Sequence, residues 1–423
     1  MRVLWITNMP IGGAARKLNL KLNSGTWMEP TLKDLLKHPD VQVAVAAKAY
    51  VSELTVVETE GVIHYLVPAS PKKIYPYWGA SEQAVWKQVI EKAQPEIIMV
   101  WGTEYAHGLC ALCQAEGIPA VVVIQGILDT IAEFYLCGMT NQELRRCTTL
   151  RSILKRDSIR QEQKLYRKRA AYEREMLQRA GNVIVENEWA RGNVRRIAPG
   201  CQLFEMKQKI NEVFFQHQWK GSACRQHVIF CSAPVGYPLK GFHNILKAMA
   251  LIKEKYPDVR LRVPGIPNPY QQTKSLRGWL TKRDYTQYIM QLIDQLNLKG
   301  NIDFLEHMDS IDIAKELEEA NLFIVASSIE NQSTSLREAM VVGTPCIASF
   351  VGGMTDIVKD RVNGRLFRCE DYSHLAYIVD DLFSHSDICQ TLSENARTSM
   401  RAYWDNTDPE QIYHIYQTIL CEK

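Results

Sequence analysis

The sequence predicts an α/β protein made of two Rossmann-like domains that face each other across a cleft. Short apolar segments of the kind that form buried strands alternate with helical stretches. This alternation weakens between residues 204 and 225 and then starts again. Alternating strands and helices are typical of parallel βαβ units. At 423 residues, the chain is too long for one ordinary hydrophobic core and suits two domains.

Six strand-like segments are expected in the first half of the chain. They are Arg2–Asn8, Val41–Ala47, Val62–Pro68, Glu96–Gly102, Ala120–Gly126 and Asn182–Asn187. Helical stretches separate several of them, at Ser24–Leu36, Ser81–Ala93 and Glu104–Glu116. These elements predict a first domain over residues 1–208.

The second half repeats the pattern and predicts a second domain over residues 209–404. Its expected strands are His227–Ala233, Arg260–Gly265, Ile302–Met308, Leu322–Ser328 and Pro345–Phe350. Helices are expected between them, for example at Gly241–Tyr256 and Asp284–Leu296. Residues 405–423 read as a helix with one apolar face, which carries Tyr413, Tyr416 and Leu420. We expect this helix to return and pack on the first domain.

Composition excludes several classes of protein. The net charge of +3 is too small to indicate a nucleic-acid partner, and 46% hydrophobic residues fit a soluble globular chain. No run of 18 apolar residues is present, and the start MRVLWITNMP does not read as a signal peptide. The eleven cysteines form no disulfide framework, and the lone C-x-x-C of Cys110 and Cys113 has no second pair to complete a metal site. We therefore expect a cytoplasmic protein with reduced thiols.

The most informative stretch runs from residue 322 to 350. Leu322–Ala326 reads as a buried strand, and a polar loop follows it. Ser335 and Glu338 have the spacing of an S-x-x-E capping box, which predicts the start of a helix. A helix N-terminus that follows a parallel strand binds phosphate well, whereas the carboxylates of Glu330 and Glu338 suit hydroxyl groups. A sugar nucleotide offers both kinds of group.

These motifs resemble those of the retaining glycosyltransferases of family 4. Glu330 and Glu338 match the Glu-x7-Glu signature of that family, Lys240 and Gly241 match its Lys-Gly pair, and EAMVVGTPCIAS, FVGGMTDIV and NGRLF follow its order. SSIENQSTSLREAM looks most like bacterial capsule and exopolysaccharide transferases. The resemblance implies the GT-B fold, with an acceptor-binding first domain and a second domain that binds a nucleoside-diphosphate sugar, here UDP-linked. It also implies synthesis of a surface polysaccharide, without a metal ion or another cofactor.

The resemblance assigns donor roles to both carboxylates and to the helix start. Glu338 would accept hydrogen bonds from the ribose hydroxyls, although a capping residue needs no ligand. Glu330 would face the transferred sugar as a catalytic residue, although a loop glutamate is usually solvated. Ser335 and Leu336 would offer backbone N–H groups to the diphosphate, and Thr334 would add a hydroxyl.

Lys240 is the expected cation for the diphosphate and is counted with the catalytic residues. Many relatives carry an arginine about five residues earlier, where this chain has Val235. Arg16 or Lys17 is a candidate replacement for that missing charge.

The acceptor side is expected near the ends of the first strands. Gly12 and Gly13 match a glycine pair of the family, which would let backbone approach the diphosphate or the acceptor, although they also suit a simple turn. His107 is the candidate catalytic histidine, with Glu104 beside it. Many relatives carry a functional histidine where this chain has Gln125, whose amide can hydrogen-bond a sugar but cannot titrate.

Residues 144–179 carry twelve Lys and Arg against four Asp and Glu, with apolar residues among them. The simplest interpretation is a solvated helix with a basic face. The alternative is a surface that docks on anionic lipid, and we hypothesise peripheral association with the inner face of the membrane.

Two other functions stay open. A sugar-nucleotide epimerase can share this fold but needs acid–base residues in the cleft. A catalytically degenerate transferase that acts as a subunit would explain the Val235 and Gln125 departures.

Overall fold

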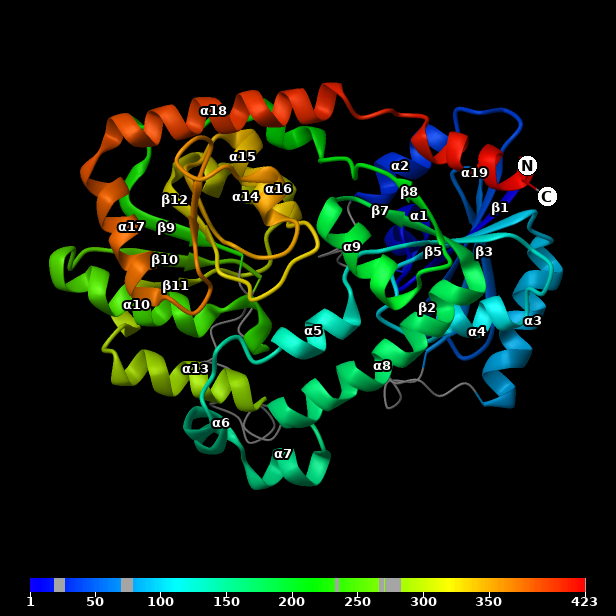
Figure 1. Cartoon of the computed structure of the whole chain (residues 1–423), viewed down its shortest axis with the longest axis horizontal. Helices are drawn as coiled ribbons and strands as arrows, with labels where there is room; N and C mark the ends of the chain where they lie inside the picture. Colours follow the sequence, from blue (N-terminus) through cyan, green and yellow to red (C-terminus); the bar gives the residue numbers. More distant parts are fainter. Residues whose placement is uncertain (19–26, 70–78, 233–235, 266–269, 271–282, 423) are drawn as a thin grey trace. The chain divides into compact units, whose positions relative to one another are not determined.

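The computed structural model describes residues 1–18, 27–69, 79–232, 236–265, 270 and 283–422, and it divides into two compact units (Figure 1). The first unit comprises residues 1–129, 166–209 and 407–423. The second comprises residues 130–165 and 210–406. Each unit is built around its own sheet.

The first unit contains an eight-stranded sheet in the order β3-β4-β2-β1-β5-β6-β7-β8. Its strands are β1 Arg2–Thr7, β2 Gln42–Ala49, β3 Thr55–Thr59, β4 Val62–Pro68, β5 Ile97–Trp101, β6 Ala120–Val123, β7 Gly181–Val185 and β8 Gln202–Glu205. Every neighbouring pair is parallel except β3–β4. The six expected strands are all present. β3 and β8 were not expected, because neither segment has a long apolar run and neither contains a buried residue.

Helices cover both faces of this sheet. They are α1 Gly12–Lys17, α2 Met28–Leu35, α3 Ala80–Ala93, α4 His107–Cys113, α9 Glu188–Ile197 and α19 Gln411–Cys421, together with the C-terminal part of α8 Ile159–Ala180. Successive side chains of β1 point to opposite faces of the sheet and belong to two different hydrophobic clusters. Leu4 packs with residues of α3 and α4, and Trp5 packs with residues of α2 and α19.

The returning C-terminal helix is confirmed. α19 packs its apolar face on the sheet of the first unit, where Tyr416 is fully buried. The indole N–H of Trp5 donates a 2.8 Å hydrogen bond to the Tyr416 hydroxyl oxygen. This contact joins residues that lie 411 positions apart in the chain.

The second unit contains a six-stranded parallel sheet in the order β11-β10-β9-β12-β13-β14. Its strands are β9 Arg225–Cys231, β10 Arg260–Val263, β11 Ile302–Phe304, β12 Ala320–Val325, β13 Cys346–Ser349 and β14 Arg365–Phe367. Its helices are α10 Phe242–Lys255, α13 Asp284–Gln295, α14 Ser310–Glu319, α15 Thr334–Val342, α16 Met354–Ile357, α17 Tyr372–Ser384 and α18 Ser386–Asp405. Among the residues that the structure describes, this unit also has 3-10 segments at Glu212–Gln216, Pro238–Lys240 and Lys299–Asn301.

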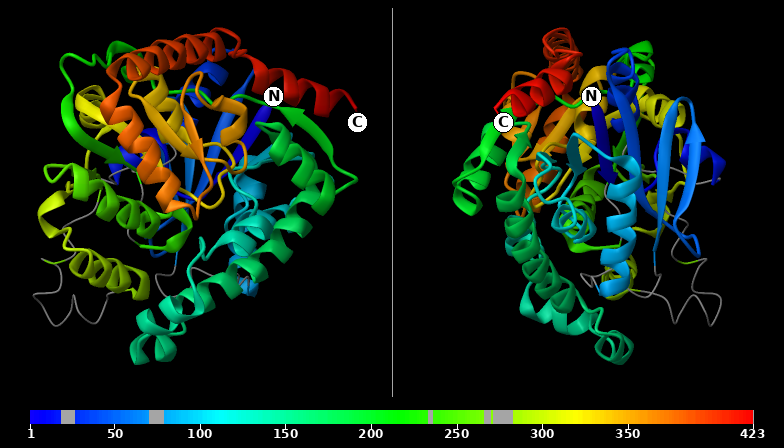
Figure 2. Two further views of the ribbon diagram at one scale, coloured as in Figure 1. Left: turned by 60° about the vertical axis from the view of Figure 1, so that its left-hand side comes forward. Right: turned by 90° about the vertical axis from the view of Figure 1, so that its right-hand side faces the viewer.

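Residues 130–165 belong to the second unit, although they precede the boundary expected at residue 208. They carry the end of α5 Leu128–Phe134, α6 Asn141–Cys147, α7 Leu150–Lys155 and the start of α8 (Figures 1 and 2). Polar contacts tie them to that unit: the Glu143 carboxylate accepts from Lys247 at 2.8 Å and from the Tyr288 hydroxyl at 2.6 Å. This insertion is held in place by side chains that are distant in the sequence. Its assignment to the second unit could therefore not be predicted from local sequence patterns.

Candidate functional site

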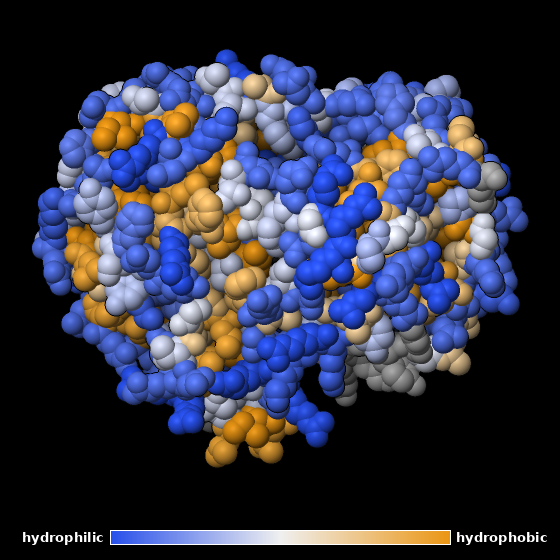
Figure 3. Space-filling view, in the orientation of Figure 1, coloured by the Kyte–Doolittle hydropathy of each residue, from blue (hydrophilic) through white to orange (hydrophobic). Residues whose placement is uncertain are grey.

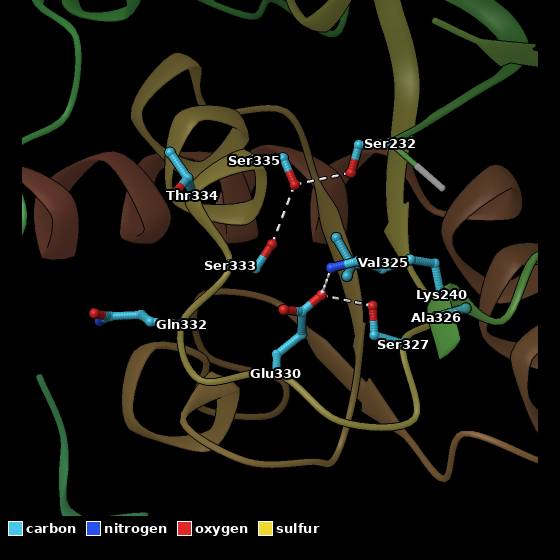
Figure 4. Close-up of a pocket in the computed structure, with 10 residues that line it drawn as sticks. All are labelled: Ser232, Lys240, Val325, Ala326, Ser327, Glu330, Gln332, Ser333, Thr334 and Ser335. Carbon is cyan, nitrogen blue, oxygen red and sulfur yellow. Dashed lines mark hydrogen bonds and ion pairs between the residues drawn. The ribbon is translucent and has the colours of Figure 1, made fainter. Parts of the chain in front are cut away.

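The sheet of the second unit reverses its strand order at β9, which has β10 on one side and β12 on the other. In doubly wound sheets, ligands bind outside the carboxyl ends of the strands at such a point. A cavity of about 310 Å³ opens there, and we call it the β9–β12 cavity. Its lining residues are Ser232, Lys240, Val325, Ala326, Ser327, Glu330, Gln332, Ser333, Thr334 and Ser335 (Figure 4).

Lys240 and Glu330 form an ion pair inside this cavity, and their side chains point toward each other (Figure 4). The Ser327 hydroxyl donates a 2.7 Å hydrogen bond to the same carboxylate oxygen that Lys240 contacts. Burial alone would lower the pKa of Lys240, but the negative charge of Glu330 raises it above its usual value. The lysine is therefore held as a cation at the carboxyl ends of β9 and β12.

Two glycines make this arrangement possible. Gly241 follows Lys240 with a φ of +69°, and a Cβ there would overlap the carbonyl oxygen of Ala326. Gly352 has a φ of +52°, and a Cβ there would overlap the carbonyl oxygen of Glu330. The neighbouring Gly353 N–H donates a 3.1 Å hydrogen bond to that carbonyl. The Lys-Gly pair and the FVGGM segment thus let the backbone approach closely enough to place both charged residues.

The start of α15 corrects the expected capping box. Ser333, rather than Ser335, is the N-cap, and its hydroxyl accepts a 3.3 Å hydrogen bond from the Leu336 N–H. Because the helix begins two residues earlier than expected, Ser335 lies within its first turn. Its hydroxyl instead lies 2.8 Å from that of Ser232 and 3.1 Å from that of Ser333. Thr334, also in the first turn, lines the cavity.

Glu338 lies one turn further along α15 and does not line the β9–β12 cavity. Among the described residues, its carboxylate has no recorded hydrogen bond or ion pair. Burial raises its pKa to about 8, while the nearby Arg337 charge acts in the opposite direction. Residues three and four apart share a helix face, so Glu338 follows Ser335 and Thr334 along α15. A partly buried carboxyl group of this kind suits a ligand that donates hydrogen bonds.

Sequence reasoning missed three hydroxyls of the cavity, those of Ser232, Ser327 and Ser333. Ser232 directly follows β9, and Ser327 lies two positions after β12. A polar residue just after a buried apolar strand was the available signal for both, because carboxyl ends of parallel strands share one edge of the sheet. The pairing of β9 with β12 brings Ser232 and Ser327 together. This pairing could not be predicted from local sequence patterns.

The candidate residues of the first unit have partners within that unit. Arg16 binds the carboxylates of Glu29 at 3.0 Å and Glu60 at 2.5 Å. Gly12 and Gly13 begin α1, where Gly12 has a φ of +56° and a Cβ on Gly13 would overlap Thr59. Backbone conformation and close packing thus account for glycine at both positions. A contact between these glycines and a ligand stays a prediction.

The other candidates of the first unit lie where β5 and β6 end. Burial and the charge of Lys48 lower the pKa of His107 to about 3, so its imidazole is neutral near pH 7. The Glu104 carboxylate accepts a 2.9 Å hydrogen bond from Asn8, and burial raises its pKa. A Cβ on Gly102 would meet the side-chain oxygens of both Glu104 and Gln125. The catalytic role of His107 and the sugar contact of Gln125 stay predictions.

Glu173 on α8 was not anticipated. It is fully buried, and it accepts hydrogen bonds from the Thr103 hydroxyl at 2.6 Å and from the Leu128 N–H at 3.0 Å. Burial raises its pKa to about 8. Glu173 thereby ties α8 to the loops that follow β5 and β6.

Four further expectations concern Val235, metal sites, membrane spans and cysteines. Val235 lies outside the described residues. No cluster of three or more His, Cys, Asp or Glu side chains that could hold a metal ion occurs in the described ranges. Across the same part of the chain, no helix has the length and apolarity needed to cross a bilayer. All eleven cysteines are free thiols.

Residues 216–399 match the family model described as glycosyl transferases group 1. This range contains every residue that lines the β9–β12 cavity, together with Glu338. A D-inositol 3-phosphate glycosyltransferase of Mycobacterium leprae is 30% identical over 173 residues, which are 40% of this chain and 37% of that protein. The chain therefore spans well under half the length of this curated relative. The second unit is therefore similar to the glycosyl transferases group 1 over residues 216–399.

Solved structures show the fold of the whole chain. Sucrose-phosphate synthase from Thermosynechococcus elongatus superposes with a TM-score of 0.72 at 17% identity and 100% coverage of both chains. HepE from Anabaena, in complex with UDP-glucose, superposes with a TM-score of 0.63 at 15% identity, again covering 100% of both chains. The chain thus has a two-domain α/β fold of the GT-B kind.

Proposed function

We propose that the chain is a retaining glycosyltransferase that moves a sugar from a nucleoside-diphosphate sugar to a glycan or lipid-linked saccharide. One observation carries the proposal. The β9–β12 cavity combines a helix N-terminus, a partly buried Lys–Glu pair and five hydroxyl groups at the point where the sheet reverses its order. This cavity lies in the range matched by the glycosyl transferase group 1 model.

The diphosphate is the part of the donor that these groups suit best. The α15 N-terminus and the hydroxyls of Ser232, Ser333, Thr334 and Ser335 supply donors for phosphate oxygens. Lys240 has three N–H donors, so its ammonium can keep Glu330 and still bind a phosphate. When the glycosidic bond breaks, the diphosphate gains negative charge, and the fixed positive charge and helix N-terminus stabilise it.

The two carboxylates would then bind the donor's hydroxyl groups. Glu330, oriented by Ser327 and Lys240, would accept from the transferred sugar. Glu338, which has no recorded partner among the described residues, would accept from both ribose hydroxyls. In this retaining reaction, the bond from the sugar's anomeric carbon to phosphate breaks and a bond to the acceptor oxygen forms on the same face. The acceptor proton goes to the departing phosphate oxygen, so the protein mainly positions groups and stabilises charge.

The identity of donor and acceptor is proposed from resemblance. UDP is the proposed nucleotide, since the structurally similar HepE was solved with UDP-glucose. The acceptor is proposed to belong to surface polysaccharide synthesis, because SSIENQSTSLREAM resembles capsule transferases. The proposed location is the cytoplasm, at the inner face of the membrane. No metal ion is proposed, because Lys240 and the α15 N-terminus supply the positive potential that the leaving group needs.

A donor screen tests the proposal. Purified protein is mixed with UDP-, GDP- and TDP-sugars, and donor binding is followed by the rise in melting temperature, because a ligand that binds the native state stabilises it. The best donor is then used in a product assay with saccharide acceptors, with and without EDTA. We expect transfer with UDP-sugars that EDTA leaves unchanged.

Variants connect the product to the proposed site. Lys240→Ala and Glu338→Gln should both impair transfer, whereas Lys359→Ala, an exposed lysine of the same unit, should not. Wild-type transfer in both site variants would reject the site. An epimerised nucleotide sugar without any transfer would favour the epimerase. Donor binding without either product would favour a degenerate subunit.

A further inference from the structure

Helix α7 exposes apolar side chains to an unusual degree. Leu150 is 81% exposed, Leu154 is 84% exposed and Ile153 is 53% exposed. Their spacing of three and four residues places them on one face of this six-residue helix. Figure 3 shows hydrophobic atoms bordered by hydrophilic ones at the place that α7 occupies in Figure 1. We call these three residues the α7 tip.

The opposite face of α7 is polar and anchored. Ser152 is fully buried and forms a reciprocal capping box with Thr149. The Thr149 hydroxyl donates a 3.2 Å hydrogen bond to the Asp284 carboxylate at the start of α13. A helix on a soluble protein normally buries its apolar face, whereas α7 attaches through polar groups and presents its apolar face outward. The exposure is therefore imposed by anchoring contacts rather than by fraying of the helix.

Exposed basic residues lie on both sides of the α7 tip in the sequence. Six exposed Lys or Arg residues lie within 145–164: Arg145, Arg146, Lys155, Arg156, Arg160 and Lys164. The two acidic residues of the same range are engaged. Asp157 pairs with Arg151 at 3.0 Å, and Glu162 accepts from the Tyr135 hydroxyl at 2.6 Å and lies 3.6 Å from Arg283. The positive charge of this surface is therefore not cancelled by its own carboxylates.

We propose that the α7 tip inserts into the interfacial layer of an anionic bilayer, with the surrounding lysines and arginines on the lipid phosphates. Short apolar insertion next to basic residues is the chemistry that holds peripheral proteins on such surfaces. The proposal narrows the whole basic stretch 144–179 to α7 and its neighbours, because Arg169 on α8 is 8% exposed and stacks on Tyr105 and Tyr166. It stands independently of the proposed transferase activity.

A second copy of this chain fits the surface less well. A twofold contact would place the same six cations of each copy against one another. A stable protein interface also buries roughly 800 Å² on each partner, more than three side chains of one short helix provide. An anionic lipid surface complements the charge and needs only shallow apolar insertion.

Flotation of the full chain with lipid vesicles tests this inference. One vesicle set is pure phosphatidylcholine, and the other mixes it with phosphatidylglycerol. We expect flotation with the mixed vesicles alone, weakened by added salt. The Leu150→Ser/Leu154→Ser variant should lose about tenfold or more in bound fraction at limiting lipid. The matched control is Ile311→Ser, an apolar residue of α14 that is 48% exposed and should float as the wild type does.

A second variant tests the charge. Arg145→Gln/Arg146→Gln should bind mixed vesicles more weakly, while Lys359→Gln should not. Wild-type protein that floats with neither vesicle set, or equally with both, overturns the inference. Unchanged flotation of Leu150→Ser/Leu154→Ser also overturns it. Sedimentation without lipid tests whether the chain self-associates. If the wild type self-associates and Leu150→Ser/Leu154→Ser does not, the α7 tip binds a second copy of the chain, and the inference is overturned. Melting curves check that each variant is folded.

Discussion

The two units differ in how their candidate residues are used. In the second unit, Lys240, Glu330 and the α15 hydroxyls converge on one cavity, and the Lys–Glu pair lies inside it. In the first unit, Arg16 is paired with two carboxylates of its own unit, and His107 is held neutral by burial. Where charged groups gather around a space, they indicate a ligand. Where they satisfy one another within a unit, they first explain its stability.

The largest expected effect separates the two candidate cations. Lys240→Ala removes the cation of the β9–β12 cavity, so kcat/KM should fall by about a hundred- to a thousandfold, as for loss of one charge-stabilising donor. Arg16→Ala removes a half-exposed side chain from a surface ion pair and should change kcat/KM by less than about threefold. Steady-state kinetics with the best donor give both values. A loss in Arg16→Ala as large as that in Lys240→Ala would show that the first unit supplies a diphosphate cation.

The next effect concerns two carboxyl groups that share a pKa of about 8, Glu338 in the second unit and Glu173 in the first. If ribose hydroxyls donate to ionised Glu338, donor binding lowers its pKa. Affinity should then rise with pH up to about 8, by as much as about tenfold per pH unit. Calorimetric titrations between pH 6 and 9 measure this slope. Glu338→Gln should flatten it, and Glu173→Gln should leave it intact. An unchanged slope in Glu338→Gln would remove that residue from the donor site.

A backbone test comes third. Gly352→Ala adds a Cβ that overlaps the Glu330 carbonyl at a positive φ, so it should destabilise the protein by about 2 kcal/mol and displace Glu330. Gly192 of α9 in the first unit is exposed, and its Cβ would meet no atom within 4 Å. Gly192→Ala should therefore stabilise its helix by about 0.5–1 kcal/mol. Denaturant unfolding measures both free energies. Equal stability of the two variants would show that the Glu330 loop adapts freely.

The smallest expected effect is a change in the slope of protein stability against pH. The unfolded chain ionises Glu173 near pH 4.3, whereas the folded protein keeps it protonated up to about pH 8. Because the folded state binds the extra proton between these values, this group makes stability fall as pH rises through the window and adds no further loss above it. Glu173→Gln should flatten that part of the stability curve. Melting temperatures between pH 5 and 8 test this, and an undiminished slope would assign the pH dependence to other groups.

Much of the fold could be predicted because its signals are local. Buried parallel strands appear as apolar runs, so all six expected strands of the first unit are present. The edge strands β3 and β8 lack that signature and were missed. The start of α15 was predicted to within two residues, because its N-cap was assigned to Ser335 instead of Ser333. Both serines fit a cap locally, and they are distinguished only in three dimensions, by the contact of Ser335 with Ser232 just after β9.

By itself, the sequence determined the α/β class, the two sheets, and the glycines and acids that frame the proposed donor site. These features depend on residues a few positions apart, whose periodicity and backbone freedom can be read directly. Only the tertiary structure decided that β9 pairs with β12 and brings Ser232 to α15. It also placed residues 130–165 with the second unit and left the apolar face of α7 outside. These outcomes depend on contacts between residues tens to hundreds of positions apart, whose net free energy no local pattern records.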